Sequence, residues 1–381
     1  MDRRAFADEA PGRLVPTIHD ALAYVPDDLE PVVDIAAVAP AMLEATQALG
    51  ELKGACRRLA EPSILIRPLQ RREALTSSAM EGTFSTQDAL ILAERGIERD
   101  DDDATREVRN YVRALDDAVV ALGRLPICHR ILTDAHRTLL SGLGHGRGAQ
   151  KRPGEYKPDQ NWIGGRTIDT ARYVPPPPVE ARACMDALER YLNRDLRPFP
   201  LLDLALVHYQ FEAIHPFADG NGRVGRMLVA LMAVESGLLD MPVLYISPAM
   251  EHRKDEYIDL MFGVSTRGEW TPWIIFFLAR VAESCRETIA TIDRLIALQD
   301  DYRRRAGDAM RSASAITLVD HLFRQPTVTV NEAADVLGVS YQAVRKTIDR
   351  LVDVGILSVF PDAYPRLFVA RGILDAANPP H

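Results

Sequence analysis

One twelve-residue segment, from His215 to Arg226, gathers residue types that bind phosphate and move protons. Gly220 and Gly222 would let backbone N–H groups approach phosphate oxygens closely. A helix is expected to begin near Arg223, and its amino terminus adds partial positive charge at the same point. Arg223 and Arg226 are three residues apart, so they share one helix face and can each fork onto a phosphate. The pattern predicts a nucleotide site.

Two further side chains in this segment suit a metal ion and a proton. Asp219 supplies one carboxylate, which suits Mg²⁺ that is shared with substrate phosphates. His215 can accept a proton near neutral pH, a step worth on the order of 10²–10⁴ in rate. Taken singly, each residue could simply cap a helix or turn the chain. A plain turn, however, would not need two arginines, a carboxylate and a histidine together.

Two predicted helices position this segment. The first spans Leu201–Ile214 and delivers His215, where Pro216 ends it; the second spans Arg223–Gly237. The segment resembles the signature of the Fic family, H-x-F-x-[D/E]-G-N-G-R-x-x-R. Every defined position of that signature is met, at His215, Phe217, Asp219, Gly220, Asn221, Gly222, Arg223 and Arg226.

The resemblance implies a role for each of these residues. His215 would deprotonate a hydroxyl of a target protein, and Asp219 would hold Mg²⁺. Asn221 and the loop amides would bind the α- and β-phosphates of ATP, Arg223 the β-phosphate side, and Arg226 the γ-phosphate. The related Doc kinases carry Lys at the position of Gly222 and lack the final Arg. The resemblance therefore implies AMP transfer from ATP, with self-modification as one possible outcome.

A second resemblance lies upstream of the loop. This region resembles the family's flap, which aligns a target segment by strand addition. It consists of Lys151–Tyr156, a short hairpin expected over Asn161–Tyr173, and a proline run at 175–178. The expected docking residues are Asn161, Trp162, Ile163 and Gly164. Many relatives have Arg at the position of Lys157, and Lys cannot make a planar bidentate contact.

The sequence also suggests a built-in inhibitor. A helix expected over 71–80 ends at Gly82, and Ser77, Glu81 and Gly82 fit the family's inhibitory pattern [S/T]-x-x-x-E-[G/N]. A solvated Glu at a helix end is the alternative. Arg226, however, needs a partner when no ATP is bound, and a carboxylate can satisfy it. Our hypothesis is that Glu81 pairs with Arg226 and blocks the γ-phosphate site.

Composition narrows the class of protein. The 381 residues carry a formal net charge of −9, which argues against a surface that coats nucleic acid throughout. Four scattered cysteines indicate buried thiols in a reducing compartment. The charged N-terminus is unlike a signal peptide, and the apolar runs are too short to span a bilayer. These features predict a cytoplasmic protein with no membrane contact.

Helical periodicity dominates, so the predicted fold is all-α: a Fic-type helical bundle with a short β-hairpin flap. Three parts are expected. Residues 1–105 form an N-terminal helical region with the inhibitory helix at about 71–82, which follows a partly ordered lead-in over residues 1–30. Residues 106–300 form the catalytic domain. Residues 306–373 resemble a winged helix-turn-helix. Its expected helices span Ala315–Phe323, Val330–Leu337, with Asn331 as cap, and Tyr341–Val354, and its expected hairpin joins strands Ile356–Phe360 and Arg366–Ala370.

The partner of this C-terminal part stays open. Arg345, Lys346 and Arg350 decorate the candidate recognition helix, as in a DNA reader. Residues 312–381 nevertheless hold six Arg/Lys and seven Asp/Glu, a net charge of −1, whereas DNA binders usually show a basic excess. A protein contact or homodimer is the alternative. Two other functions also remain possible: a regulator that only senses nucleotide, and removal of AMP with Glu81 positioning water.

Overall fold

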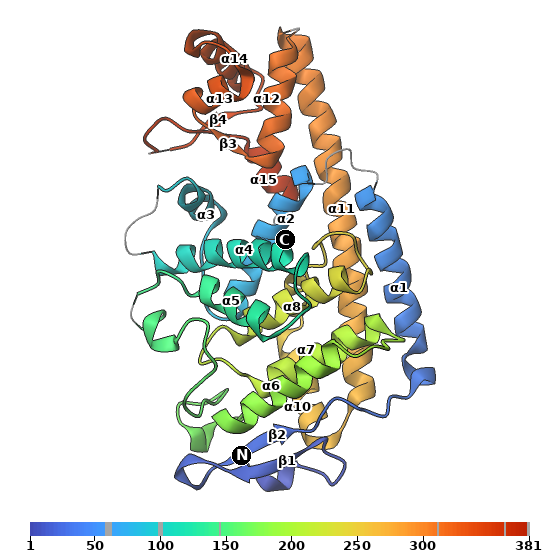
Figure 1. Ribbon diagram of the computed structural model, residues 1–381. Coiled ribbons are helices and arrows are strands. Elements are labelled where there is room, and N and C mark those ends of the chain that lie inside the picture. The colour runs from blue at the N-terminus through green and yellow to red at the C-terminus, as the bar shows by residue number, and fades with distance from the viewer. Residues whose placement is uncertain (58–62, 98–101, 145, 311, 362, 379–381) are drawn as a thin grey trace. The chain divides into compact units, whose positions relative to one another are not determined.

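A computed structural model describes residues 1–57, 63–97, 102–144, 146–310, 312–361 and 363–378. Within these ranges the chain forms fifteen α-helices and two small antiparallel sheets, which confirms the all-α prediction (Figure 1). The helices are α1 (Ile35–Arg57), α2 (Ser63–Met80), α3 (Gln87–Glu94), α4 (Asp103–Leu122), α5 (His129–Leu139), α6 (Pro178–Leu192), α7 (Pro200–Ile214), α8 (Asn221–Glu235), α9 (Ser247–Glu251), α10 (Lys254–Arg267), α11 (Trp270–Met310), α12 (Ala313–Arg324), α13 (Val330–Leu337), α14 (Tyr341–Asp353) and α15 (Arg371–Ala377). None of the helices in the described ranges is both long and apolar enough to cross a membrane.

The chain divides into two compact units, each assembled from separate stretches of sequence. The first unit comprises residues 1–53, 73–85 and 101–286, and the second comprises residues 54–72, 86–100 and 287–381. Three of the five boundaries between these stretches fall within helices, in α1, α2 and α11. The division into three consecutive parts stays a prediction.

The core of the first unit surrounds α7 and α8. Helix α7 is buried on nearly every side, as expected for a helix that is apolar all round. It packs against α8, and α4 packs against α5 and α8. Phe211, Phe217 and Trp273 are fully buried there. This packing holds the turn between α7 and α8 in place.

The N-terminal lead-in is more ordered than expected. Strands β1 (Gly12–Pro16) and β2 (Leu22–Pro26) pair antiparallel, and β2 packs against α6 and α7. Tyr24 is fully buried and donates a hydrogen bond to the carbonyl of Pro11 at 2.8 Å. The prediction of a partly ordered lead-in was therefore wrong. Five-residue strands are too short to show a clear period in sequence.

Helix α2 is longer than predicted at its start. It begins at Ser63, and Pro68 lies inside it without ending it. A proline near the beginning of a helix removes only one N–H donor and leaves the later turns intact. The predicted end is confirmed, because Gly82 adopts a left-handed conformation with φ of 79°.

The predicted flap is less regular than a hairpin. Ile163 and Tyr173 form a single antiparallel bridge, and a 3₁₀ turn at Ile168–Thr170 fills the loop. Gly164 has a φ of 68°, which turns the chain away from further pairing. The proline run stays extended only until Pro178, which begins α6.

In the second unit, α12, α13 and α14 accompany a sheet of order β3-β5-β4, with strands Thr327–Val328, Phe368–Val369 and Ser358–Val359. Both the predicted helices and the predicted hairpin are present, whereas β3 and α15 were missed. Thr329, and not Asn331, caps α13, through a capping box with Glu332. The interpretation as a winged helix-turn-helix stays a prediction.

Candidate active site

The turn between α7 and α8 is a tightly braced loop. His215 ends α7 in a left-handed conformation with φ of 48°, and Gly220 precedes α8 with φ of 79°. The side chain of Asn221 accepts a hydrogen bond from the Phe217 N–H at 2.8 Å and donates one to the Phe217 carbonyl at 2.9 Å. Asn221 is buried and its side chain holds the loop together. Its predicted phosphate contact stays a prediction.

His136, on α5, contacts the same loop. The sequence did not indicate a role for it. Its Nε2 lies 3.0 Å from the carbonyl oxygen of Asp219, and the Gly154 N–H donates to its Nδ1 at 2.9 Å. Burial lowers the pKa of His136 to about 4, so the ring is neutral and Nε2–H is the donor. The only sequence signal was its position among the apolar residues of α5.

His215 is held as a neutral imidazole. Burial, and then the nearby Lys157 ammonium, lower its pKa to about 4. Its side chain is 21% exposed, and its Nδ1 is buried without a hydrogen-bond partner among the described residues. Lys157 donates to the Asn161 carboxamide oxygen at 2.7 Å, and burial lowers the Lys157 pKa to about 7. An uncharged His215 can accept a proton.

Asp219 and Arg223 face each other beside this histidine. One carboxylate oxygen of Asp219 accepts from the Gly220 N–H at 2.6 Å and from Arg223 at 2.9 Å. The Asp219 side chain is 40% exposed, so it remains accessible. Arg223 is buried and also forms an ion pair with Glu107 on α4, a partner that the sequence did not indicate. An accessible single carboxylate beside a glycine-containing loop at a helix amino terminus fits Mg²⁺ that is shared with a nucleotide.

Arg226 is bound by the segment that ends α2. It donates to the Ser77 hydroxyl at 2.9 Å, the Ser77 carbonyl at 2.8 Å and the Glu81 carboxylate at 2.8 Å. Burial alone would raise the pKa of Glu81, but Arg226 outweighs it and holds that pKa below its usual value. A Cβ at Gly222 would collide with the Glu81 carboxylate. Ser77 and Glu81, two of the three predicted inhibitory residues, therefore contact Arg226, and their inhibitory role stays a prediction.

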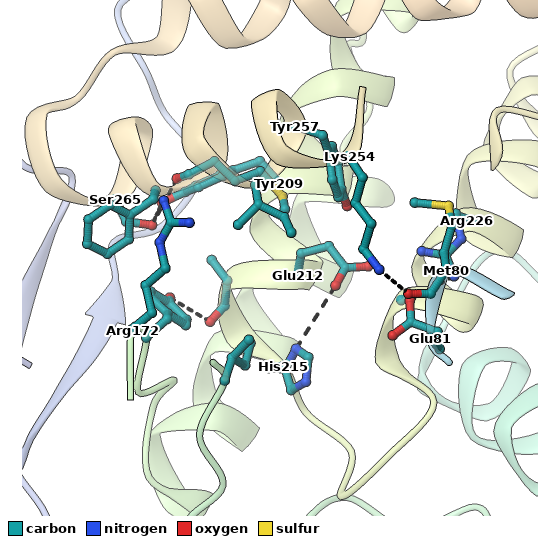
Figure 2. A pocket seen from close by; sticks show the side chains of 17 residues that line it. Met80, Glu81, Arg172, Tyr209, Glu212, His215, Arg226, Lys254, Tyr257 and Ser265 are labelled. Atoms are coloured by element: carbon teal, nitrogen blue, oxygen red, sulfur yellow. Dashed lines mark hydrogen bonds and ion pairs between the residues drawn. The ribbon is translucent and has the colours of Figure 1, made fainter. Parts of the chain in front are cut away.

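Glu81, His215, Gly222 and Arg226 line one cavity of about 330 Å³, whereas Asp219 and Arg223 lie outside its lining. Figure 2 shows Glu81 beside Arg226, with His215 and Glu212 close by and Lys254 reaching toward Met80. The Lys254 ammonium donates to the Met80 carbonyl at 2.5 Å. The remaining wall is mostly apolar or aromatic and includes Ile163, Tyr173, Tyr209, Tyr257, Ile258, Met261 and Phe262. A cavity of this size, apolar with a few charged groups, suits a small ligand.

The predicted docking residues are only partly in this wall. Ile163 lines the cavity, whereas Asn161 donates to the Phe217 carbonyl at 3.0 Å and so ties the flap to the loop. Trp162 and Ile163 are 38% and 37% exposed. The single bridge therefore presents two apolar side chains that solvent can reach. Their docking role stays a prediction.

Two protein-family models match this chain, and one of them covers the loop. Residues 39–120 match the Fic/DOC family N-terminal region, and residues 126–233 match the Fic/DOC family domain. The chain belongs to the Fic/DOC family. The family domain thus covers the flap, His215 and Arg226, and the N-terminal match covers α2 with Ser77 and Glu81.

Curated relatives are named as adenylyltransferases. The protein adenylyltransferase Fic of Culex quinquefasciatus is 28% identical over 147 residues, covering 38% of this chain and 26% of that protein. The Drosophila melanogaster protein of the same name is 30% identical over 116 residues, 30% of this chain and 21% of the relative. The chain thus spans about a quarter of these relatives.

A crystal structure of a Fic family protein from Desulfovibrio desulfuricans shares the fold, with a TM-score of 0.57 and 22% identity. The superposition covers 90% of this chain and 98% of the Desulfovibrio desulfuricans chain. The extent of the match shows that the similarity in fold reaches beyond the catalytic loop.

His208 lies outside the cavity lining and contacts Tyr257, which lines it. Its Nε2 lies 3.0 Å from the Tyr257 hydroxyl, and its Nδ1 lies 3.4 Å from the Gly225 carbonyl. It is fully buried, and burial lowers its pKa to about 3. This placement behind the cavity is that of a supporting group.

Proposed function

We propose that this protein is an adenylyltransferase that moves AMP from ATP to a side-chain hydroxyl of a target protein in the cytoplasm. One observation supports this function above the others: His215 and Arg226 line one cavity, and Asp219 lies on the same loop with an accessible carboxylate. A protein that only senses nucleotide would not need a neutral histidine at this place. The names of the relatives point to the same reaction.

In this reaction one bond forms, one bond breaks and one proton moves. The target hydroxyl oxygen attacks the α-phosphorus of ATP, its proton passes to His215, and the bond to the β-phosphate oxygen breaks to release pyrophosphate. Since the pKa of His215 is lowered to about 4, the imidazole is unprotonated and ready at neutral pH. The α8 amino terminus and Gly222 would hold the phosphates through backbone N–H groups.

Asp219 would hold Mg²⁺ together with the phosphates, and that ion would neutralise charge on them. For Asp219 to bind the ion fully, Arg223 has to give up its hydrogen bond to the carboxylate. The ion pair with Glu107 keeps Arg223 beside the loop when this happens.

The same geometry supports autoinhibition. Glu81 occupies the guanidinium of Arg226 that we assign to the γ-phosphate. ATP and Glu81 compete for one cation, so transfer is repressed while the contact persists. A ligand or target that moves Glu81 shifts the population toward the active state.

Radiolabelled ATP with Mg²⁺ tests the reaction. The full-length Glu81→Gly protein, alone or with a mixture of candidate targets, should become labelled or should label a target. The Glu81→Gly, His215→Ala protein should lose this labelling by about 10²–10⁴-fold. Label that persists without His215 would rule out the assigned base.

Mass spectrometry of the modified protein then identifies the added group. A mass increase of one AMP supports adenylyl transfer, whereas a single phosphate would indicate a kinase. Incubation of a pre-labelled product with wild-type protein distinguishes the reverse reaction, because Glu81-dependent release of AMP would assign removal to this site.

A further inference from the structure

Glu212 is a buried carboxyl group one turn before the proposed catalytic base. It lies on α7 with its side chain in the cavity wall and 10% exposed. Its Oε2 is 4.0 Å from the Nδ1 of His215, and Figure 2 shows the two side chains facing each other. The Oε1 of Glu212 has no hydrogen-bond partner among the described residues. Nδ1 of His215 has none within ordinary hydrogen-bond geometry, although the backbone of Glu212 lies close enough to act as an acceptor and raise the pKa of His215.

The space for this carboxyl group depends on a glycine on the neighbouring helix. A Cβ at Gly225 would collide with Oε1 of Glu212 and would also press on the ring of Phe211 at 3.1 Å. Gly225 stands at one of the variable positions of the loop signature, so the signature does not account for it. Two elements, α7 and α8, thus cooperate to bury an acid beside the histidine.

The two nitrogens of His215 have different surroundings. Nδ1 is buried, so the exposed part of the side chain lies elsewhere on the ring. Nε2 is then the nitrogen available to a target hydroxyl. It can act as a base only in the tautomer in which Nδ1 carries the hydrogen, and that hydrogen needs an acceptor.

We propose that Glu212 is a positioning residue for His215: its carboxyl group accepts the Nδ1–H hydrogen bond and thereby leaves Nε2 free to take the proton of the target hydroxyl. The proposal rests on the proposed function and adds a residue that the loop signature does not contain. A small side-chain movement closes the 4.0 Å gap to hydrogen-bond distance.

The protonation state of Glu212 then controls which tautomer forms. Burial raises the pKa of Glu212 to about 8, although Arg226 lowers it. As a protonated acid, Glu212 can donate to Nδ1 and favour the tautomer with hydrogen on Nε2, which is unable to act as base there. As a carboxylate it can only accept, so ionisation favours the productive tautomer.

Other titratable groups also face this pair, among them Lys254 on α10, which lines the same cavity. Arg226 on α8 and Tyr257 on α10 have pKa values raised well above neutral, and Glu81 has a lowered one. Lys157 faces His215, and its pKa is lowered to about 7. Lys157 is therefore the group that the experiment must separate from Glu212.

The test compares kcat and its pH dependence in the Glu81→Gly background, with full-length protein, ATP and Mg²⁺. The parent should show a kcat that rises with pH as Glu212 ionises and then levels off. Because Glu81 helps to raise the pKa of Glu212 to about 8, the rise in this background should be centred below that value. Glu212→Gln keeps an acceptor oxygen in place but cannot ionise, so it should retain activity and lose this rise. Glu212→Ala removes the acceptor and should lower kcat on the order of 10- to 100-fold, with the KM for ATP little changed.

Lys157→Arg keeps the positive charge and removes titration near pH 7, so the rise should persist in this control. A rise that disappears with Lys157→Arg and survives Glu212→Gln would overturn the proposal. Equal kcat and pH profiles for Glu212→Ala and its parent would also overturn it, because the backbone carbonyl of Glu212 would then suffice as acceptor for Nδ1.

A readout that is independent of turnover separates this proposal from the proposed function. Histidine ring ¹⁵N shifts, assigned by their loss in His215→Ala, should show hydrogen on Nδ1 of His215 at pH 8.5 in the Glu81→Gly protein and less of that tautomer in Glu212→Ala. Lack of AMP transfer in the Glu81→Gly protein would overturn the proposed function alone. An unchanged ¹⁵N pattern in Glu212→Ala would overturn the role of Glu212.

Discussion

Helices α8 and α14 both carry arginines at helical spacing. The arginines of α8 are buried, whereas those of α14 are exposed. On α8, Arg223 and Arg226 are each about 2% exposed and are paired with acids from distant parts of the sequence, Glu107 and Glu81. On α14, Arg345 and Arg350 are exposed and lie near Asp349 and Asp353 of their own helix, at 3.4 and 3.7 Å. The two patterns are hard to tell apart from sequence alone.

The difference shows how the cost of burying a charge selects a specific partner. A buried guanidinium without a partner is expensive, so the fold around α8 supplies carboxylates at defined places. An exposed guanidinium is already solvated, so a neighbouring acid adds little. Buried cations can therefore act as a switch between two anions, Glu81 and a phosphate, whereas exposed ones cannot.

Replacement of the buried Arg226 should have the largest effect on stability. Arg226→Ala leaves the Ser77 groups and Glu81 without their donor and should lower the free energy of unfolding by about 3 kcal/mol. All three tryptophans lie in the first unit, so their fluorescence follows its unfolding in urea. Arg345→Ala, followed by circular dichroism, should change stability by less than about 0.5 kcal/mol. Equal losses would contradict the comparison.

The burial of His208 predicts how the free energy of unfolding depends on pH. The pKa of His208 is lowered to about 3, by burial and then by Arg226, so the unfolded chain, with a pKa near 6.5, binds the proton first. Stability is therefore lost as pH falls below about 6.5. Between pH 6.5 and 5 the loss due to His208 should be about 2 kcal/mol.

Measuring tryptophan unfolding of wild type and His208→Gln at both pH values isolates this contribution. The acid-induced loss should be smaller in the variant. The same comparison cancels Glu212, whose raised pKa acts with the opposite sign over this range. In the second unit, His321→Gln serves as control, since His321 is only partly buried. An identical pH response of wild type and His208→Gln would refute the prediction.

Release of Arg226 from its carboxylate should raise activity. Glu81→Gly removes the competing anion, and if the inhibited state holds about 90% or more of the molecules, transfer should rise about tenfold or more. Label incorporation per minute at saturating ATP measures the ratio to wild type. As a matched control, removing an exposed acid of α14 with Asp349→Gly should leave transfer unchanged. Equal rates for wild type and Glu81→Gly would exclude the inhibitory role.

The smallest effect is expected at the exposed arginines. Because Arg345 and Arg350 already have acidic neighbours, we expect no salt-dependent shift of a random DNA duplex at low ionic strength. A DNA reader using Arg345, Lys346 and Arg350 would instead show a salt slope of about 3 that falls on mutation of each. Such a slope would restore the DNA interpretation of the second unit and disfavour a protein contact.

Much of the fold could be predicted because its helices are long and periodic. The helices on both sides of the loop, and α13 and α14, lie within a few residues of the predicted bounds. Several of the errors share one cause: short elements contain too few residues to show a period. The β1–β2 pair, β3, and the single bridge at Ile163 and Tyr173 are all of this kind. Thr329 was missed as a cap because Asn331, another good capping residue, stands two positions later.

The sequence by itself determined the chemistry of the loop, because a histidine, a carboxylate, two small residues and two arginines stand within twelve residues and local geometry keeps them together. It also contained the pattern around Glu81, but 145 residues separate that carboxylate from Arg226, and only the tertiary structure brings them to 2.8 Å. The same is true of Glu107, His136 and Glu212, since their roles depend on which groups are buried opposite them. Burial and distance set those interactions, and both arise only when helices pack.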